Sequence, residues 1–115
     1  MDSINRQTIV PLTIREYVAG NGDTPFRDWL ATLDIEIRAR VQARVLRFEL
    51  GNLGDHKAVG AGVWEARLFF GHGYRLYFGK GDRSTLVLLF GGSKSSQPTD
   101  VRRARRLWRY YLEVK

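Results

Sequence analysis

The spacing of hydrophobic residues changes along the chain and marks its expected elements. Leu12 and Ile14 alternate with polar residues, as in a strand that is buried on one face. After Thr24-Pro25, apolar residues recur at steps of three and four, as on one side of a helix. Alternation returns after Gly60. The predicted elements are a strand over 9–18, helices over 25–32 and 35–50, strands over 64–70, 74–78 and 84–90, and a helix over 99–114.

The two middle strands are predicted to form a hairpin whose second face is polar. A three-residue loop, Gly71-His72-Gly73, would pair Phe70 with Tyr74 and Arg67 with Tyr77. In this register one face carries the side chains of Glu65, Arg67, Phe69, Arg75 and Tyr77. Arginines beside aromatic rings can clamp phosphates and stack on bases. The alternative is a half-exposed sheet face on which Glu65 neutralises Arg67.

The charge of the chain changes this picture because it points to anionic partners. The 115 residues carry a formal net charge of +7, and fifteen of the nineteen basic residues are arginine. Arginine binds phosphates through a planar fork, so a nucleic acid is one expected partner and a merely solvated basic surface is the alternative. The last predicted helix alone holds Arg102, Arg103, Arg105, Arg106 and Arg109.

A second candidate site follows the last predicted strand, where 91–97 reads Gly-Gly-Ser-Lys-Ser-Ser-Gln. Glycines with a lysine and hydroxyls can wrap a phosphate through backbone N–H groups. The segment lacks the G-x-x-x-x-G-K-[ST] spacing, so a nucleotide P-loop is not expected. The alternative is a solvated loop that caps the following helix.

Composition excludes several classes of site. The chain has no cysteine, so disulfides, thiolate nucleophiles and cysteine-ligated metals are excluded. His56 and His72 are too few for a histidine-built metal site, and each is read as a loop residue. The sequence contains no apolar run of about 20 residues, and Met1 to Thr8 lacks the apolar core of a signal peptide. We therefore expect one domain over 1–115, in the cytoplasm, with no metal and no cofactor.

Four segments together resemble a known family. They are 54–60 (GDHKAVG), 63–68 (VWEARL), 73–78 (GYRLYF) and 88–97 (LLFGGSKSSQ). Through these segments the chain resembles, from about Leu12 to Leu112, the addiction-module killer proteins, the HigB-like branch of the RelE/ParE toxin superfamily.

The resemblance implies a fold and an activity. The fold would be α+β, a twisted antiparallel sheet with a helical hairpin packed on one face, in the order strand-helix-helix-strand-strand-strand-helix. The activity would be that of a type II toxin–antitoxin toxin: a metal-independent, ribosome-dependent mRNA endoribonuclease that cuts codons in the ribosomal A site and inhibits translation. Its partner would be a cognate helix-turn-helix antitoxin, forming a toxin–antitoxin hetero-oligomer. The alternatives are a ParE-like DNA gyrase poison and an inactive RNA- or protein-binding relative.

The resemblance also selects site residues. Arg67, Arg75 and Lys94 match basic residues of the family motifs, and Lys57 matches a recurrent lysine, whereas Ser93 stands where the family has an acidic residue. Cleavage through the 2′-hydroxyl needs charge stabilisation, a base and an acid. The two arginines would stabilise the transition state, Lys94 would act as acid or base, and Tyr77 would stack on a base or transfer a proton. The expected catalytic residues are Arg67, Arg75, Lys94 and Tyr77, and the expected RNA-binding residues are Lys57, Phe69, Ser95, Arg102, Arg105 and Arg106.

Overall fold

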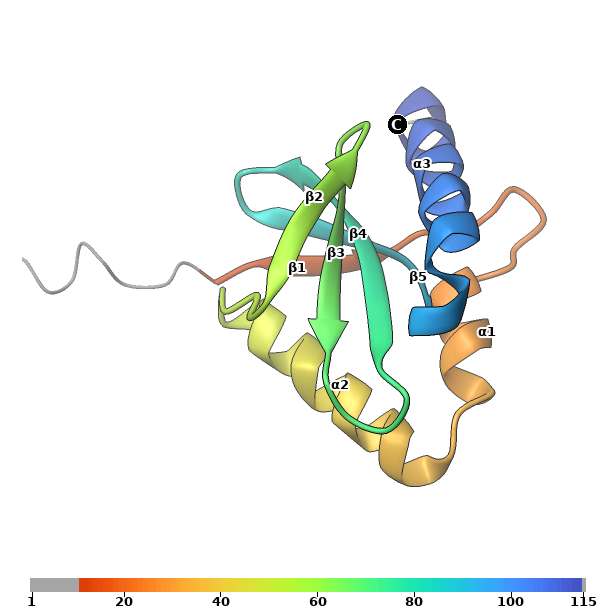
Figure 1. Cartoon of the computed structure of the whole chain (residues 1–115). Coiled ribbons are helices and arrows are strands. Elements are labelled where there is room, and N and C mark those ends of the chain that lie inside the picture. The colour runs from red at the N-terminus through yellow and green to blue at the C-terminus, as the bar shows by residue number, and fades with distance from the viewer. Residues whose placement is uncertain (1–10, 115) are drawn as a thin grey trace, which may run out of the picture.

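The computed structural model describes residues 11–114. The first two positions of the strand predicted over 9–18 lie outside this range. The described elements are β1 (Thr13–Glu16), α1 (Pro25–Ala31), α2 (Ile35–Glu49), β2 (His56–Gly60), β3 (Val63–Leu68), β4 (Tyr74–Asp82), β5 (Thr85–Ser93), the short 3₁₀ helix η2 (Lys94–Ser96) and α3 (Gln97–Val114) (Figure 1).

The strands form a mixed five-stranded sheet in the order β1-β5-β4-β3-β2. β1 pairs with β5 in parallel, while the other neighbours are antiparallel. Two predictions are therefore wrong: the sheet is not purely antiparallel, and four strands rather than three follow the helical pair. The added strand, β2, was missed because its sequence, HKAVG, lacks the alternating hydrophobic residues of a half-buried strand.

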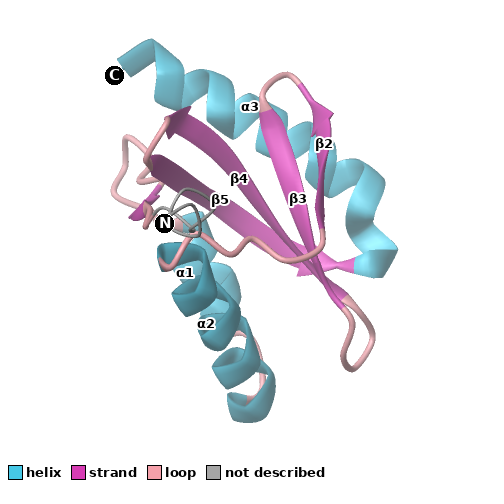
Figure 2. Cartoon of the chain, turned by 90° about the vertical axis from the view of Figure 1, so that its left-hand side faces the viewer, coloured by secondary structure: helices cyan, strands magenta, loops and turns pink. Residues whose placement is uncertain are grey.

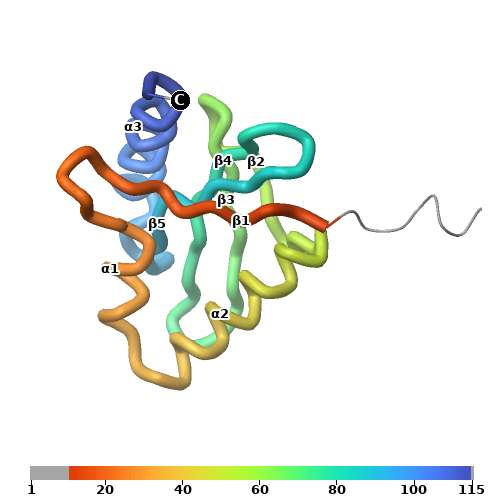
Figure 3. Tube along the Cα trace, turned by 180° about the vertical axis from the view of Figure 1, so that it is seen from behind, coloured from red at the N-terminus to blue at the C-terminus, as the bar shows by residue number. Residues whose placement is uncertain are grey.

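Helices cover both faces of the sheet (Figure 2). α1 and α2 pack on one face, where Phe26, Leu30, Val41 and Phe48 join strand residues in one hydrophobic core. This confirms the helical hairpin on one face. α3 packs on the opposite face, where Val101, Ala104, Leu107 and Trp108 form a second core with other strand residues. Viewed from behind, β1, the edge strand beside β5, runs between α3 on one side and α2 on the other (Figure 3).

The β3–β4 hairpin has a different register from the predicted one. Arg67 pairs with Arg75 and Leu68 with Tyr74, so the connection is five residues long and the pairing is shifted by two positions. A shift of two leaves every side chain on its predicted face, because side chains alternate with a period of two. Phe69, however, lies outside β3, in the loop, with 78% of its surface exposed.

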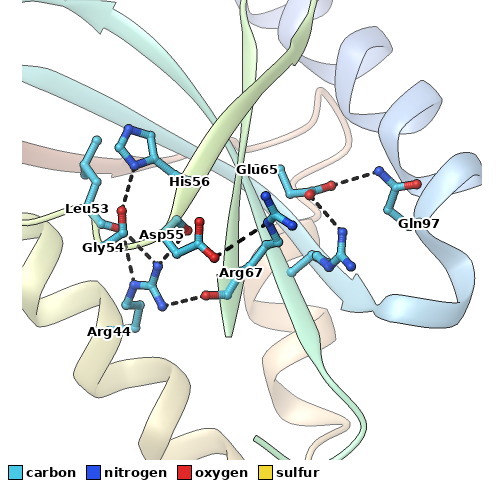
Figure 4. A network of polar contacts seen from close by, with 9 residues as sticks. Arg44, Leu53, Gly54, Asp55, His56, Glu65, Arg67 and Gln97 are labelled. Carbon is cyan, nitrogen blue, oxygen red and sulfur yellow. Dashed lines mark hydrogen bonds and ion pairs between the residues drawn. The ribbon is translucent and has the colours of Figure 1, made fainter. Parts of the chain in front are cut away.

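A buried arginine fastens α2 to the loop before β2. Arg44 is only 8% exposed and donates four hydrogen bonds to backbone carbonyls, at 2.8 Å to Arg67, at 3.0 and 3.3 Å to Leu53 and at 3.0 Å to Asp55 (Figure 4). Burial lowers the pKa of its guanidinium from the ordinary value. Gly54, at φ +67°, lies so close that an added Cβ would be 2.7 Å from the guanidinium. The hydrogen bond from Arg44 to the Arg67 carbonyl holds the end of β3 in place.

Candidate functional site

Three cations expected from the sequence line one cavity, which we call the arginine–lysine cavity. Arg67 lies near the end of β3, Arg75 near the start of β4, and Lys94 begins η2 after β5. The Lys94 amide donates to the Gly73 carbonyl at 3.1 Å, which ties the hairpin loop to η2. The cavity has a volume of about 450 Å³, and its lining is Arg67, Leu68, Phe69, Gly71, His72, Gly73, Arg75 and Lys94.

A buried carboxylate orients one of these cations. Glu65 is fully buried and accepts a hydrogen bond from Nη1 of Arg75 at 2.8 Å. Its other oxygen accepts from Nε2 of Gln97, in the first turn of α3, at 3.0 Å (Figure 4). A buried charge is tolerated when it is paired and hydrogen-bonded on its remaining atoms. Glu65 therefore fixes the Arg75 guanidinium and links it to the start of α3.

The second arginine is held more loosely. Nε of Arg67 lies 3.8 Å from a carboxylate oxygen of Asp55, which is too far for a hydrogen bond. Glu65 therefore pairs with Arg75. The alternative in which Glu65 neutralises Arg67 on a half-exposed sheet face is wrong in its choice of partner. Because its contact with Asp55 is long and half exposed, Arg67 can turn toward an anion in the cavity at little cost.

Tyr77 does not reach the surface, so the prediction that it stacks on a base or transfers a proton is wrong. α3 covers it completely, and its ring stacks on Phe90 at 5.3 Å between centroids. Burial first, and then the negative charge of Glu65, raises the pKa of the phenol well above its usual range. The hydroxyl makes no hydrogen bond within residues 11–114. The face of β3 and β4 that was predicted to be polar is therefore partly buried under α3, at Tyr77 and Glu65.

Replacing Tyr77 with phenylalanine is expected to leave cavity chemistry unchanged and to raise stability by about 1 kcal/mol, because it removes a buried hydroxyl without a partner. A raised pKa means that the folded state favours the neutral phenol. The resulting contribution of Tyr77 to the free energy of unfolding is fully present below about pH 10, the pKa of tyrosine in an unfolded chain. It is lost as the pH rises further. Urea denaturation at neutral and alkaline pH measures both effects. A Tyr77→Phe variant that unfolds more easily at neutral pH would contradict this account.

His72 was read from the sequence as a loop residue, yet it lines the arginine–lysine cavity. It is exposed at the turn between β3 and β4. Imidazole exchanges protons near neutral pH, whereas guanidinium does not. The signal available in the sequence was its position between Gly71 and Gly73, directly between two strands that each carry a cavity arginine. The roles of Glu65 and Gln97 had no comparable signal, because 32 residues separate them.

The residues expected to bind RNA fall in more than one place. Lys57, Arg102 and Arg105 line a separate depression of about 450 Å³ between β2 and α3. Arg105 also donates from Nε to the Val59 carbonyl at 3.0 Å, so part of its fork is engaged in holding α3 to β2. These residues lie outside the lining of the arginine–lysine cavity, while Phe69 belongs to it.

Two other expected RNA-binding residues lie on exposed positions. The Ser95 hydroxyl, in η2, is 2.9 Å from that of Ser93. Arg106 is exposed on α3. The segment 91–97 comprises the end of β5, all of η2 and the first residue of α3. It contributes Lys94 to the arginine–lysine cavity.

The described residues contain neither a cluster of metal-binding side chains nor a helix that could span a membrane. Within 11–114, histidine and acidic side chains form no group of three or more that could hold a metal ion. Over the same residues, none of the helices combines the length and apolar character needed to cross a bilayer. His56, on β2, instead contacts the Gly54 carbonyl through Nδ1 at 2.8 Å.

Comparison with known proteins identifies a relative. No family model matches the chain. A protein of Haemophilus influenzae, named only as an uncharacterized protein, is 39% identical over 83 residues, which are 71% of this chain and 84% of the relative. This identity extends over most of both chains, and the protein therefore belongs to the same family as the Haemophilus influenzae protein.

Proposed function

We propose that this protein is an endoribonuclease that cuts mRNA on the ribosome, and that it serves as the toxin of a RelE/ParE-like toxin–antitoxin pair with a helix-turn-helix antitoxin. The observation that carries the proposal is the convergence of Arg67, Arg75 and Lys94 on one cavity from three separate elements. Three cations at one exposed cavity, in a chain of net charge +7, suit a phosphodiester of a polyanion.

The cavity supplies what cleavage through the ribose requires. The 2′-oxygen attacks phosphorus, an O2′–P bond forms, and the P–O5′ bond breaks, which leaves a 2′,3′-cyclic phosphate and a 5′-hydroxyl. Arg75 and Arg67 stabilise the extra negative charge on the phosphorane. The imidazole of His72 accepts the proton of the 2′-hydroxyl, and the Lys94 ammonium donates a proton to O5′. Because both groups are exposed on a loop and on η2, the ribosome would have to hold the message in position.

The fold also supports the proposal. The α1–α2 hairpin on one face of the sheet agrees with the architecture that the resemblance implies for a RelE/ParE-like toxin. The cavity is formed where the β3–β4 loop meets η2, and three of the four segments that carry the resemblance, 63–68, 73–78 and 88–97, contribute residues to its lining. Lys57, Arg102 and Arg105 offer a second cationic depression for neighbouring phosphates.

Mapping RNA ends after induction of the full chain tests this function. We expect new 5′-hydroxyl ends within codons of a translated message, and none in the same message when its start codon is removed. Arg83→Ala, in the exposed turn between β4 and β5, is the matched control and should cut normally. Intact messages combined with DNA breaks and gyrase-dependent supercoiling defects would instead favour the gyrase poison. Intact messages and normal growth would favour an inactive relative.

A further inference from the structure

A larger groove lies on the other side of η2, between α1 and the start of α3. It has a volume of about 540 Å³, within the usual range for small-ligand pockets. Side chains from α1, β4, β5 and α3 reach it, among them Asp28, Trp29, Tyr74, Asp100 and Arg103. We call it the Trp29 groove. The cleavage chemistry uses none of these five side chains.

The Trp29 groove and the arginine–lysine cavity each share lining residues with a third cavity. Tyr74 and Ser93 line both the groove and a smaller neighbouring cavity, and that cavity also contains His72 and Lys94. His72 and Lys94 in turn line the arginine–lysine cavity. A phosphodiester beside Lys94 therefore lies in a cavity whose lining includes Tyr74 and Ser93, two residues that also line the groove, so an adjoining group of the same RNA has the groove as its neighbouring site.

The groove walls offer planar surfaces. The Trp29 ring lies against β5 at Gly91, where an added Cβ would be only 2.4 Å from the ring, so the glycine allows this close approach. Trp29 and Tyr74 both remain partly exposed. Arg103 places its guanidinium 4.6 Å from the centre of the Phe90 ring. Aromatic rings and guanidinium planes are the groups on which single-stranded bases stack.

The groove also contains carboxylates, which distinguish it from a phosphate site. Asp28 is exposed in the first turn of α1, and Asp100 accepts a hydrogen bond from the Ser96 hydroxyl. Negative side chains repel a phosphate backbone, but they accept hydrogen bonds from base amino and imino groups. Guanine presents two adjacent donors, N1–H and the N2 amino group, to a single carboxylate. Uracil presents only one.

We propose that the Trp29 groove binds a guanine base of the RNA, stacked on Trp29 and hydrogen-bonded to Asp28, next to the phosphodiester that is cut. This inference rests on the proposed function, since the phosphodiester in the arginine–lysine cavity is what brings the base to the groove. It gives the protein a base preference that the cationic cavity cannot supply, because phosphate contacts carry no sequence information.

Nucleotide binding to the purified full chain tests the groove without any cleavage. The probes are GMP and UMP, and the readout is the NMR signal of the Trp29 indole N–H, assigned with Trp29→Phe. GMP should shift this signal at concentrations where UMP does not. Asp28→Asn should weaken GMP binding about ten-fold, since one good base contact is worth that much discrimination. Asp23→Asn, the same change in the turn before α1, is the matched control.

Cut-site mapping then separates the two proposals. Asp28→Asn should keep cutting translated messages but lose an excess of guanine beside the cuts. Equal response of Trp29 to GMP and UMP, or an unchanged guanine excess in Asp28→Asn, would overturn the groove assignment while leaving the nuclease in place. If no message is cut at all, the nuclease proposal fails, and the GMP titration still decides whether the groove binds guanine.

Discussion

Replacing Arg75 with alanine is expected to slow cleavage of ribosome-bound message by about a thousand-fold, the effect of removing one strong donor to a developing negative charge. Arg75 is the cavity cation that is held in a fixed orientation, at 2.8 Å from the buried Glu65. A preorganised donor stabilises the transition state without moving during the reaction. The loss should therefore fall on kcat rather than on KM, measured with purified protein and programmed ribosomes.

Alanine at this position also leaves Glu65 buried without its partner, so folding must be separated from chemistry. Arg75→Lys keeps the positive charge but lacks the planar fork, and we expect it to remain folded and still lose about a hundred-fold in kcat. Arg67→Ala is a second comparison: its ion pair with Asp55 is long and half exposed, so the melting temperature of the variant should stay close to that of the unchanged protein while cleavage falls. An Arg75→Lys variant with unchanged kcat would contradict the assignment.

The prediction from sequence succeeded where one local rule determined the outcome. The faces of β3 and β4 were assigned correctly although the register was wrong by two, because alternation fixes the face and the turn fixes the register. The meeting of Lys94 with the hairpin arginines follows from strand order. β5 pairs with β4 so that Ser93 lies opposite Tyr74, and Lys94 then comes next to the hairpin loop.

The failures concern contacts between segments far apart in the sequence. Tyr77 was placed on an open face because nothing near it shows that α3 covers that face. Arg44 lies off the apolar stripe of α2, so periodicity predicts an exposed side chain, but it is buried because loop carbonyls surround it. Periodicity indicates which side of an element is apolar, and it does not indicate which polar side chains are enclosed by backbone groups from elsewhere.

Arg44 carries the largest expected effect on stability. We expect Arg44→Met to lower the free energy of unfolding by about 3 kcal/mol, because hydrogen bonds from charged donors are strong and three partly buried backbone carbonyls would lose their donor. Methionine keeps much of the apolar volume, so the loss reports the hydrogen bonds rather than a cavity. Urea denaturation measures it directly.

The matched control is Arg47→Met, on an exposed position of the same helix, which should change the free energy of unfolding by less than about 0.5 kcal/mol. Arg44 also holds the Arg67 carbonyl at 2.8 Å, so its removal should loosen the end of β3 and lower cleavage at temperatures where the variant is still folded. Amide hydrogen exchange should then be faster at Arg67, whose N–H donates to the Asp55 carbonyl at 2.9 Å. If Arg44→Met and Arg47→Met unfold at the same urea concentration, the four hydrogen bonds do not stabilise the fold as argued. In that case the position of Arg67 depends on the sheet alone.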